Sequence, residues 1–76
     1  MVEYFAKYLL THRELEWHVN KYGFKLSADK TCRVIEGEDR ISALRNALLL
    51  EGEVRRQEKA FSITLEGIYN MGERVF

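Results

Sequence analysis

Three side chains in this sequence are soft metal ligands, and the cysteine among them could also act as a nucleophile: His12, His18 and Cys32. On one straight helix, their spacing would turn the two histidines about 120° apart, so they could not share an ion. Zinc sites use closely spaced cysteine and histidine pairs, and a nucleophilic thiol needs an adjacent base. Cys32 lies in an alternating apolar segment, where a lone cysteine is typically a small buried hydrophobe. We therefore expect no metal, no cofactor and no catalytic residue.

A short acidic segment, which contains Glu36, Glu38 and Asp39, is the second place where chemistry could occur. A calcium loop needs oxygen ligands at alternate positions, a central glycine and a late glutamate, and this segment lacks that spacing. Asp39 is instead a residue type that caps the N-terminus of a helix. The glycines are scattered and form no phosphate-binding motif. We interpret the segment as a solvated loop before a helix, and the protein as non-enzymatic.

Basic residues form two groups that could contact nucleic-acid phosphates. The first surrounds an expected hairpin and the second lies on an expected helix: Lys21, Lys25, Lys30 and Arg33, and then Arg55, Arg56 and Lys59. Acidic residues interleave with the second group, which favours ion pairs along the helix. The chain has 12 basic and 12 acidic residues and no net charge, whereas DNA-binding domains usually carry a basic excess. A dimeric nucleic-acid-binding regulator is therefore the alternative hypothesis.

The 76 residues predict a single small globular domain over 1–76. A chain this short buries only about 60% of the surface that its unfolded form exposes, and such domains often gain stability from disulfides, metals or self-association. Cys32 is the only cysteine, which excludes an internal disulfide and suits a reducing, cytoplasmic compartment. No apolar run approaches the ~18 residues of a membrane span, so we expect no membrane partner.

The first part of the chain fits both helix and strand. Every second residue from Val2 to Leu10 is apolar, as in a strand, but Phe5 and Leu9 also belong to a helical stripe. Residues 11–14 match a capping box, and apolar residues follow them at helical spacing up to Gly23. We therefore favour two N-terminal helical segments, over 2–10 and 12–22, with a strand over 2–10 as the alternative.

A β-hairpin is predicted next, from two alternating segments, 24–27 and 31–35, on either side of the polar tripeptide 28–30. A lone hairpin is marginal in water, so we expect one of its faces to be buried against helices. The residues that share this face are Phe24, Leu26, Cys32 and Val34.

After Asp39, apolar spacing predicts a helix over 40–51. The helical spacing resumes from Phe61 and predicts a second helix over 54–71, or one long helix with a flaw at Gly52. A strand over 61–65 is the competing interpretation, because this segment alternates and contains β-branched residues. The expected fold is α+β: two N-terminal helical segments, a β-hairpin, and a long C-terminal helical region packed against it.

The run Leu48-Leu49-Leu50 is the main indication of function. Three consecutive helical positions spread over about 200°, so this helix is apolar on more than one stripe. Little of the chain is left to cover it, and we therefore expect a homodimer. The candidate dimer interface comprises Leu44, Leu48, Leu49 and Leu50.

Aromatic residues are the candidates for contact with a different protein, because tyrosine and tryptophan are enriched at interfaces. The three residues selected are Tyr4, Tyr8 and Trp17. Together with the neutral charge and the missing motifs, they favour a small non-enzymatic regulatory or adaptor protein that acts by protein–protein binding.

Overall fold

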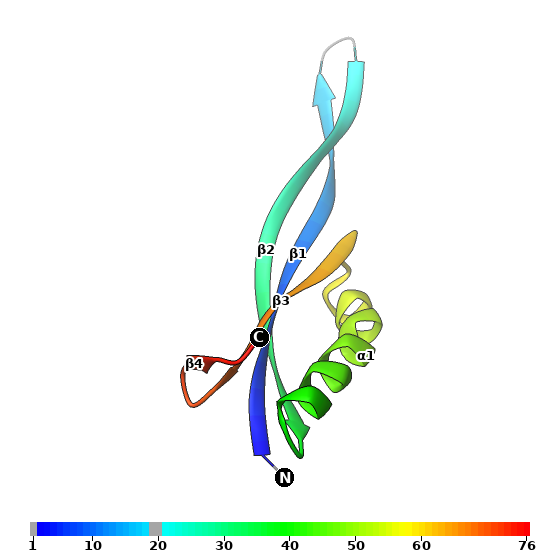
Figure 1. Cartoon of the computed structure of the whole chain (residues 1–76). Helices are drawn as coiled ribbons and strands as arrows, with labels where there is room; N and C mark the ends of the chain where they lie inside the picture. The colour runs from blue at the N-terminus through cyan, green and yellow to red at the C-terminus, as the bar shows by residue number, and fades with distance from the viewer. Residues whose placement is uncertain (1, 19–20) are drawn as a thin grey trace.

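The computed structural model describes residues 2–18 and 21–76, and the side chains of residues 14–18, 21, 22 and 24 lie outside that description. The described elements are, in chain order, β1 (Val2–His18), β2 (Lys21–Gly37), α1 (Arg40–Glu58), β3 (Ser62–Asn70) and β4 (Glu73–Arg74). The strands form one antiparallel sheet in the order β2-β1-β3-β4. The helix α1 lies against one face of this sheet, mainly on β2 and β3 (Figure 1). The fold is therefore α+β.

The expected N-terminal helices over 2–10 and 12–22 are wrong. β1 is one long strand that pairs with β2 without interruption from Val2, opposite Gly37, to His18, opposite Lys21. The tripeptide 28–30, expected to be a turn, lies inside β2. The helical spacing and the capping box are local signals. They are outweighed by the antiparallel ladder, in which β1 is paired with β2 along its whole length. The Thr11 hydroxyl, expected to cap a helix, instead forms a hydrogen bond with the Ser62 hydroxyl on β3.

The C-terminal half contains one helix in the described chain instead of a long helical region. The predicted start is confirmed, because Asp39 caps α1 and its carboxylate accepts a hydrogen bond of 2.8 Å from the backbone N–H of Ser42. The helix continues through Gly52 and ends where Lys59 adopts the left-handed conformation, with φ of 54°. The expected helix over 54–71 is wrong, because this left-handed residue turns the chain back and Ser62–Asn70 pairs with β1 as β3.

The core lies between α1 and one set of alternating residues on β1. Tyr4, Ala6 and Tyr8 belong to this set and are buried. They face small helix residues, including Ala47, whose size lets the helix approach the sheet closely. The Tyr8 hydroxyl donates a buried hydrogen bond of 2.7 Å to the Ala47 carbonyl. This contact ties the middle of the helix to the middle of the central strand.

The hairpin continues far beyond the layer that α1 covers. The ladder between β1 and β3 ends at Thr11, opposite Ser62, whereas the ladder between β1 and β2 continues to His18. Residues 12–18 and 21–27 therefore form a two-stranded extension, here called the distal ribbon, which projects past β3 and α1 in Figure 1. The radius of gyration is 15.6 Å, against about 11 Å for a compact domain of this length. The chain is thus elongated, with a small core at one end.

Two glycines with opposite surroundings give a test of the packing. A Cβ at Gly37 would lie 2.7 Å from the backbone nitrogen of Ala43, whereas a Cβ at Gly52 would meet only the end of the Arg56 side chain, at 3.8 Å. Gly37→Ala should therefore destabilise the fold by about 1–3 kcal/mol. Gly52→Ala should stabilise it by up to about 1 kcal/mol, because glycine is a poor helix former. Urea unfolding of both variants measures the two effects, and equal shifts for the pair would contradict this packing.

Candidate functional site

The face of the sheet opposite α1 has no second layer in the described part of the chain. We call it the open face. Alternation and the strand register assign its members, since directly paired residues lie on the same side of a sheet. On β1, β2 and β3 they include Phe5, Lys7, Leu9, Lys30, Cys32, Val34, Glu66 and Tyr69.

Apolar side chains on the open face are exposed to solvent. Phe5 is 46% exposed and lies directly between Val34 on β2, which is 55% exposed, and Tyr69 on β3. Leu9 is 37% exposed and lies four residues beyond Phe5 on β1. Leu26, at the start of the distal ribbon, is 60% exposed. Scattered exposed apolar residues are ordinary, whereas direct neighbours such as Val34, Phe5 and Tyr69 make this face a candidate interaction site.

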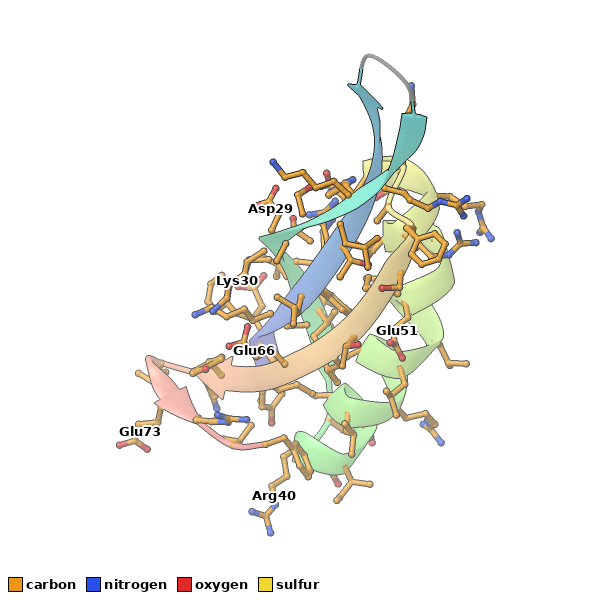
Figure 2. The ribbon with its side chains drawn as sticks, turned by 90° about the horizontal axis from the view of Figure 1, so that it is seen from above. Asp29, Lys30, Arg40, Glu51, Glu66 and Glu73 are labelled. Atoms are coloured by element: carbon orange, nitrogen blue, oxygen red, sulfur yellow. The ribbon has the colours of Figure 1, made fainter. Side chains whose placement is uncertain are left out.

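Charged groups surround this apolar patch and are partly neutralised by neighbours. The Lys7 ammonium lies 5.3 Å from the centre of the Tyr69 ring. Lys30 Nζ donates to Glu66 Oε1 at 3.2 Å, and both residues lie on the side of the sheet away from α1 (Figure 2). The second carboxylate oxygen of Glu66, Oε2, is buried and has no hydrogen-bond partner among the described residues. Buried polar atoms normally have a hydrogen-bond donor, from the protein or from ordered water.

The outer face of α1 is a second exposed apolar surface. Leu49 is 76% exposed, Leu48 is 47% exposed and Ile41 is 62% exposed. Leu44 and Leu50 are instead half-buried and pack against the core. The structure therefore separates the four leucines expected at a dimer interface, and places two of them on the surface.

The aromatic residues expected to contact a partner are distributed differently. Tyr4 and Tyr8 are 5% and 0% exposed and belong to the core beneath α1, so they offer no surface to another protein. Trp17 lies outside the residues whose side chains are described. The open-face residues Phe5, Leu9 and Tyr69 were not selected from the sequence as candidate contacts. Strand alternation over 2–10 could have identified Phe5 and Leu9, because it places them on the other face of the strand from Tyr4 and Tyr8.

The basic residues do not form one surface. Lys30 lies on the open face, whereas Arg33 lies on the face toward α1 and donates to Glu58 Oε1 at 2.9 Å. This hydrogen bond from the guanidinium lowers the pKa of the Glu58 carboxyl below its usual value. Lys25 is exposed on the distal ribbon, and the Lys21 side chain lies outside the description. The other three expected contacts lie at the C-terminal end of α1 and are exposed: Arg55, Arg56 and Lys59.

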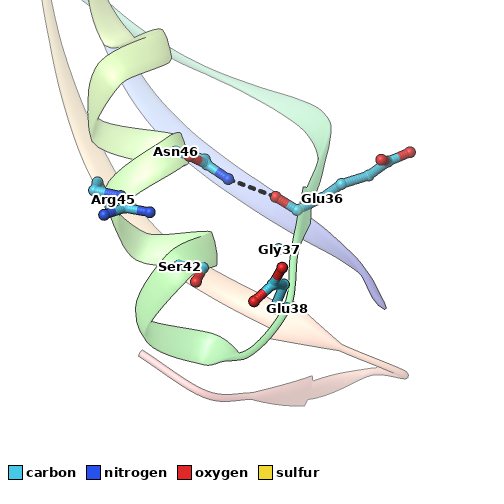
Figure 3. Close-up of a pocket in the computed structure, with 6 residues that line it drawn as sticks. All are labelled: Glu36, Gly37, Glu38, Ser42, Arg45 and Asn46. Carbon is cyan, nitrogen blue, oxygen red and sulfur yellow. Dashed lines mark hydrogen bonds between the residues drawn. The ribbon is translucent and has the colours of Figure 1, made fainter. Parts of the chain in front are cut away.

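A small recess of about 250 Å³ lies where β2 leads into α1. Its lining is mostly polar and comprises Glu36, Gly37, Glu38, Ser42, Arg45 and Asn46 (Figure 3). The Asn46 amide donates a hydrogen bond of 2.7 Å to the Glu36 carbonyl across it, which fastens the helix to the end of β2. Ligand pockets are typically larger than about 300 Å³ and mainly apolar. The recess therefore has a structural explanation.

No family model, curated protein or solved structure matches this chain. No helix in the described part of the chain has the length and hydropathy that a membrane span requires. Among the same residues, no three acidic, histidine or cysteine side chains gather as a metal site. The open face and the outer face of α1 are thus the candidate functional surfaces.

Tyr8 should make the fold sensitive to alkali. Burial, with a further contribution from the Glu51 carboxylate, raises the pKa of the Tyr8 hydroxyl from 10.0 to about 12. The unfolded chain therefore ionises first, so this contribution to stability is complete below pH 10 and is lost as the pH rises toward about 12. Tyr8→Phe should abolish that part of the decline, and should destabilise the fold by about 1 kcal/mol near neutrality because a buried hydrogen bond is lost.

Denaturant midpoints measured across this alkaline range test the prediction. Tyr69→Phe is the matched control, because it removes a hydroxyl from the opposite face of the sheet and should keep the wild-type slope. An identical pH dependence for Tyr8→Phe and wild type would contradict the assignment.

Proposed function

We propose that this chain is a small non-enzymatic regulatory or adaptor protein that acts by protein–protein binding and works as a homodimer. The observation that carries the proposal is the group of exposed apolar side chains on the open face, centred on Phe5, Leu9 and Val34. A sheet that is apolar on both faces needs a layer on each side. α1 supplies one layer, and the described chain has no element left for the other.

The shape of the molecule supports self-association. A two-stranded ribbon is marginally stable in water without further packing, and the distal ribbon extends beyond both β3 and α1. A chain with a small core gains stability when a partner covers such an element. Binding is therefore coupled to the integrity of the fold itself.

The outer face of α1 offers a separate surface for a different protein. Its exposed residues Ile41, Leu48 and Leu49 lie on the opposite side of the molecule from the open face. Apolar residues on the solvent side of a helix suit an amphipathic helix or a groove on a partner. This arrangement supports an adaptor that joins its own copy on one side and another protein on the other.

The alternative, a dimeric nucleic-acid-binding regulator, has weaker support. Lys30 and Arg33 each pair with a carboxylate, and they lie on opposite faces of the sheet. The formal net charge is zero. Phosphate binding relies on several cations that converge on one surface. The basic residues of β2 do not form such a surface, because Lys30 and Arg33 point to opposite sides of the sheet.

We expect the purified protein to have twice the mass of one chain at micromolar concentration. Sedimentation velocity over a dilution series measures this. The association should persist or strengthen in high concentrations of sulfate, because apolar burial is strengthened by such salts whereas surface ion pairs are screened. A monomeric mass at every concentration would reject the homodimer. Dissociation by moderate salt would reject the apolar interface.

A further inference from the structure

We propose that the second copy packs on the open face, sheet against sheet. A twofold axis relates the two copies and lays the distal ribbon of each across the Phe5 and Val34 region of the other copy's open face. This inference rests on the proposed homodimer and names its surface. Residues of the outer face of α1, where the leucine run suggested an interface, then stay accessible in the dimer.

The first support is the continuity of the open face along the hairpin. The register places Leu26, opposite Arg13, on the same side of the ladder as Cys32 and Val34. Leu26 is 60% exposed although it lies beyond the layer that α1 covers. The exposed apolar surface of the open face thus extends into the distal ribbon, where a second copy can cover it.

The second support is the need of the distal ribbon for a constant partner. It comprises the seven residue pairs from His12–Ser27 to His18–Lys21, or about 23 Å of strand at ~3.3 Å per residue. Because an isolated ribbon of two strands is marginal, a molecule that covers it adds to its stability. Another copy of the chain is the partner that is present wherever the chain itself is present.

The third support is the exposed area. The chain has an accessible surface of 5641 Å², against roughly 4,850 Å² expected for a compact monomer of this mass. The excess of about 800 Å² is close to the surface that each partner buries in a stable interface of standard size. An elongated chain with this excess therefore matches one half of a homodimer.

A twofold, face-to-face arrangement also accounts for particular groups. Each distal ribbon would cover the Phe5 and Val34 patch of the other copy, so both open faces gain their missing layer at once.

Pairing through the free edge of β2 is the less favourable way to join two sheets. β2 is the edge strand next to β1, and it carries Lys25, Lys30 and Arg33. Lysines on an edge strand are a common means by which native sheets discourage edge-to-edge addition. The charges on β2 thus disfavour addition at its edge, and they leave the open face, where Val34 and Leu26 flank the ion-paired Lys30, as the favourable contact.

The single cysteine gives a direct test, because Cys32 is exposed and lies on the open face between Lys30 and Val34. Its alkylation by a maleimide should be at least about tenfold slower at a concentration where dimers predominate than after dilution to monomers. The control is Cys32→Ser combined with Leu49→Cys, which places the thiol on the outer face of α1. Its alkylation rate should change by less than about twofold over the same dilution.

A matched pair of variants tests the same surface by mass. Val34→Glu should raise the dissociation constant of the dimer at least about 100-fold, because it puts a charge into an apolar interface. Leu49→Glu, at an even more exposed position on α1, should leave it unchanged. Circular dichroism of diluted samples verifies that each variant keeps the wild-type secondary structure.

The outcomes separate this inference from the proposed function. A wild-type dimer in which Cys32 reacts freely and the thiol at position 49 is protected would overturn the open-face assignment and leave the homodimer intact. The same holds if Leu49→Glu dissociates the dimer and Val34→Glu does not. A monomeric wild type would reject the homodimer and this surface together. Slow alkylation of Cys32 with dissociation by Val34→Glu supports both.

Discussion

The pairing of β1 with two neighbours, together with its contact to α1, is the constraint on which the rest of the structure depends. β1 is hydrogen-bonded to β2 on one side and to β3 on the other. Its alternate residues face in opposite directions, and those on one side, including Tyr8, are buried by the helix. The hydrogen bond from Tyr8 to Ala47 fixes the position of α1 along the strand. The other side of the same strand is thereby committed to the open face.

This constraint explains why one face of the hairpin is buried and the other is exposed. Close approach of the helix requires small residues such as Ala43 and Ala47, and it requires Gly37 where the chain passes under the first turn. With one helix in the described chain, the fold can close a single side. The apolar residues of the other side, such as Val34, then remain exposed to solvent instead of being packed within the chain.

The sequence allowed some features to be predicted because their signals are local. The helix start at Asp39 depends on one side chain and the three residues after it, and it was predicted correctly. The alternation that groups Leu26, Cys32 and Val34 on one face was also recognised, although that face was expected to lie against helices of the same chain. The structure leaves all three side chains exposed.

Other features could not be predicted because their causes are distant in the chain. Residues 11–14 match a capping box, and only the partner strand β2 decides that they continue β1. The helical spacing from Phe61 was favoured over the strand alternation of residues 61–65, and the pairing of β3 with β1, which decides for the strand, joins residues far apart in sequence. Tyr4 and Tyr8 were expected to contact another protein because their residue type is common both at interfaces and in cores, and burial depends on the position of α1.

The order of the elements along the chain has a consequence for biosynthesis. β1 and β2 precede α1, so the whole hairpin leaves the ribosome before the helix that covers its inner face is complete. During that interval both apolar faces of the hairpin, with Tyr4 and Tyr8 on one side and Phe5 and Leu9 on the other, are exposed on the nascent chain. Exposed apolar surface of this kind is the condition under which unfinished sheets aggregate. The lysines along β2 protect its edge in this period.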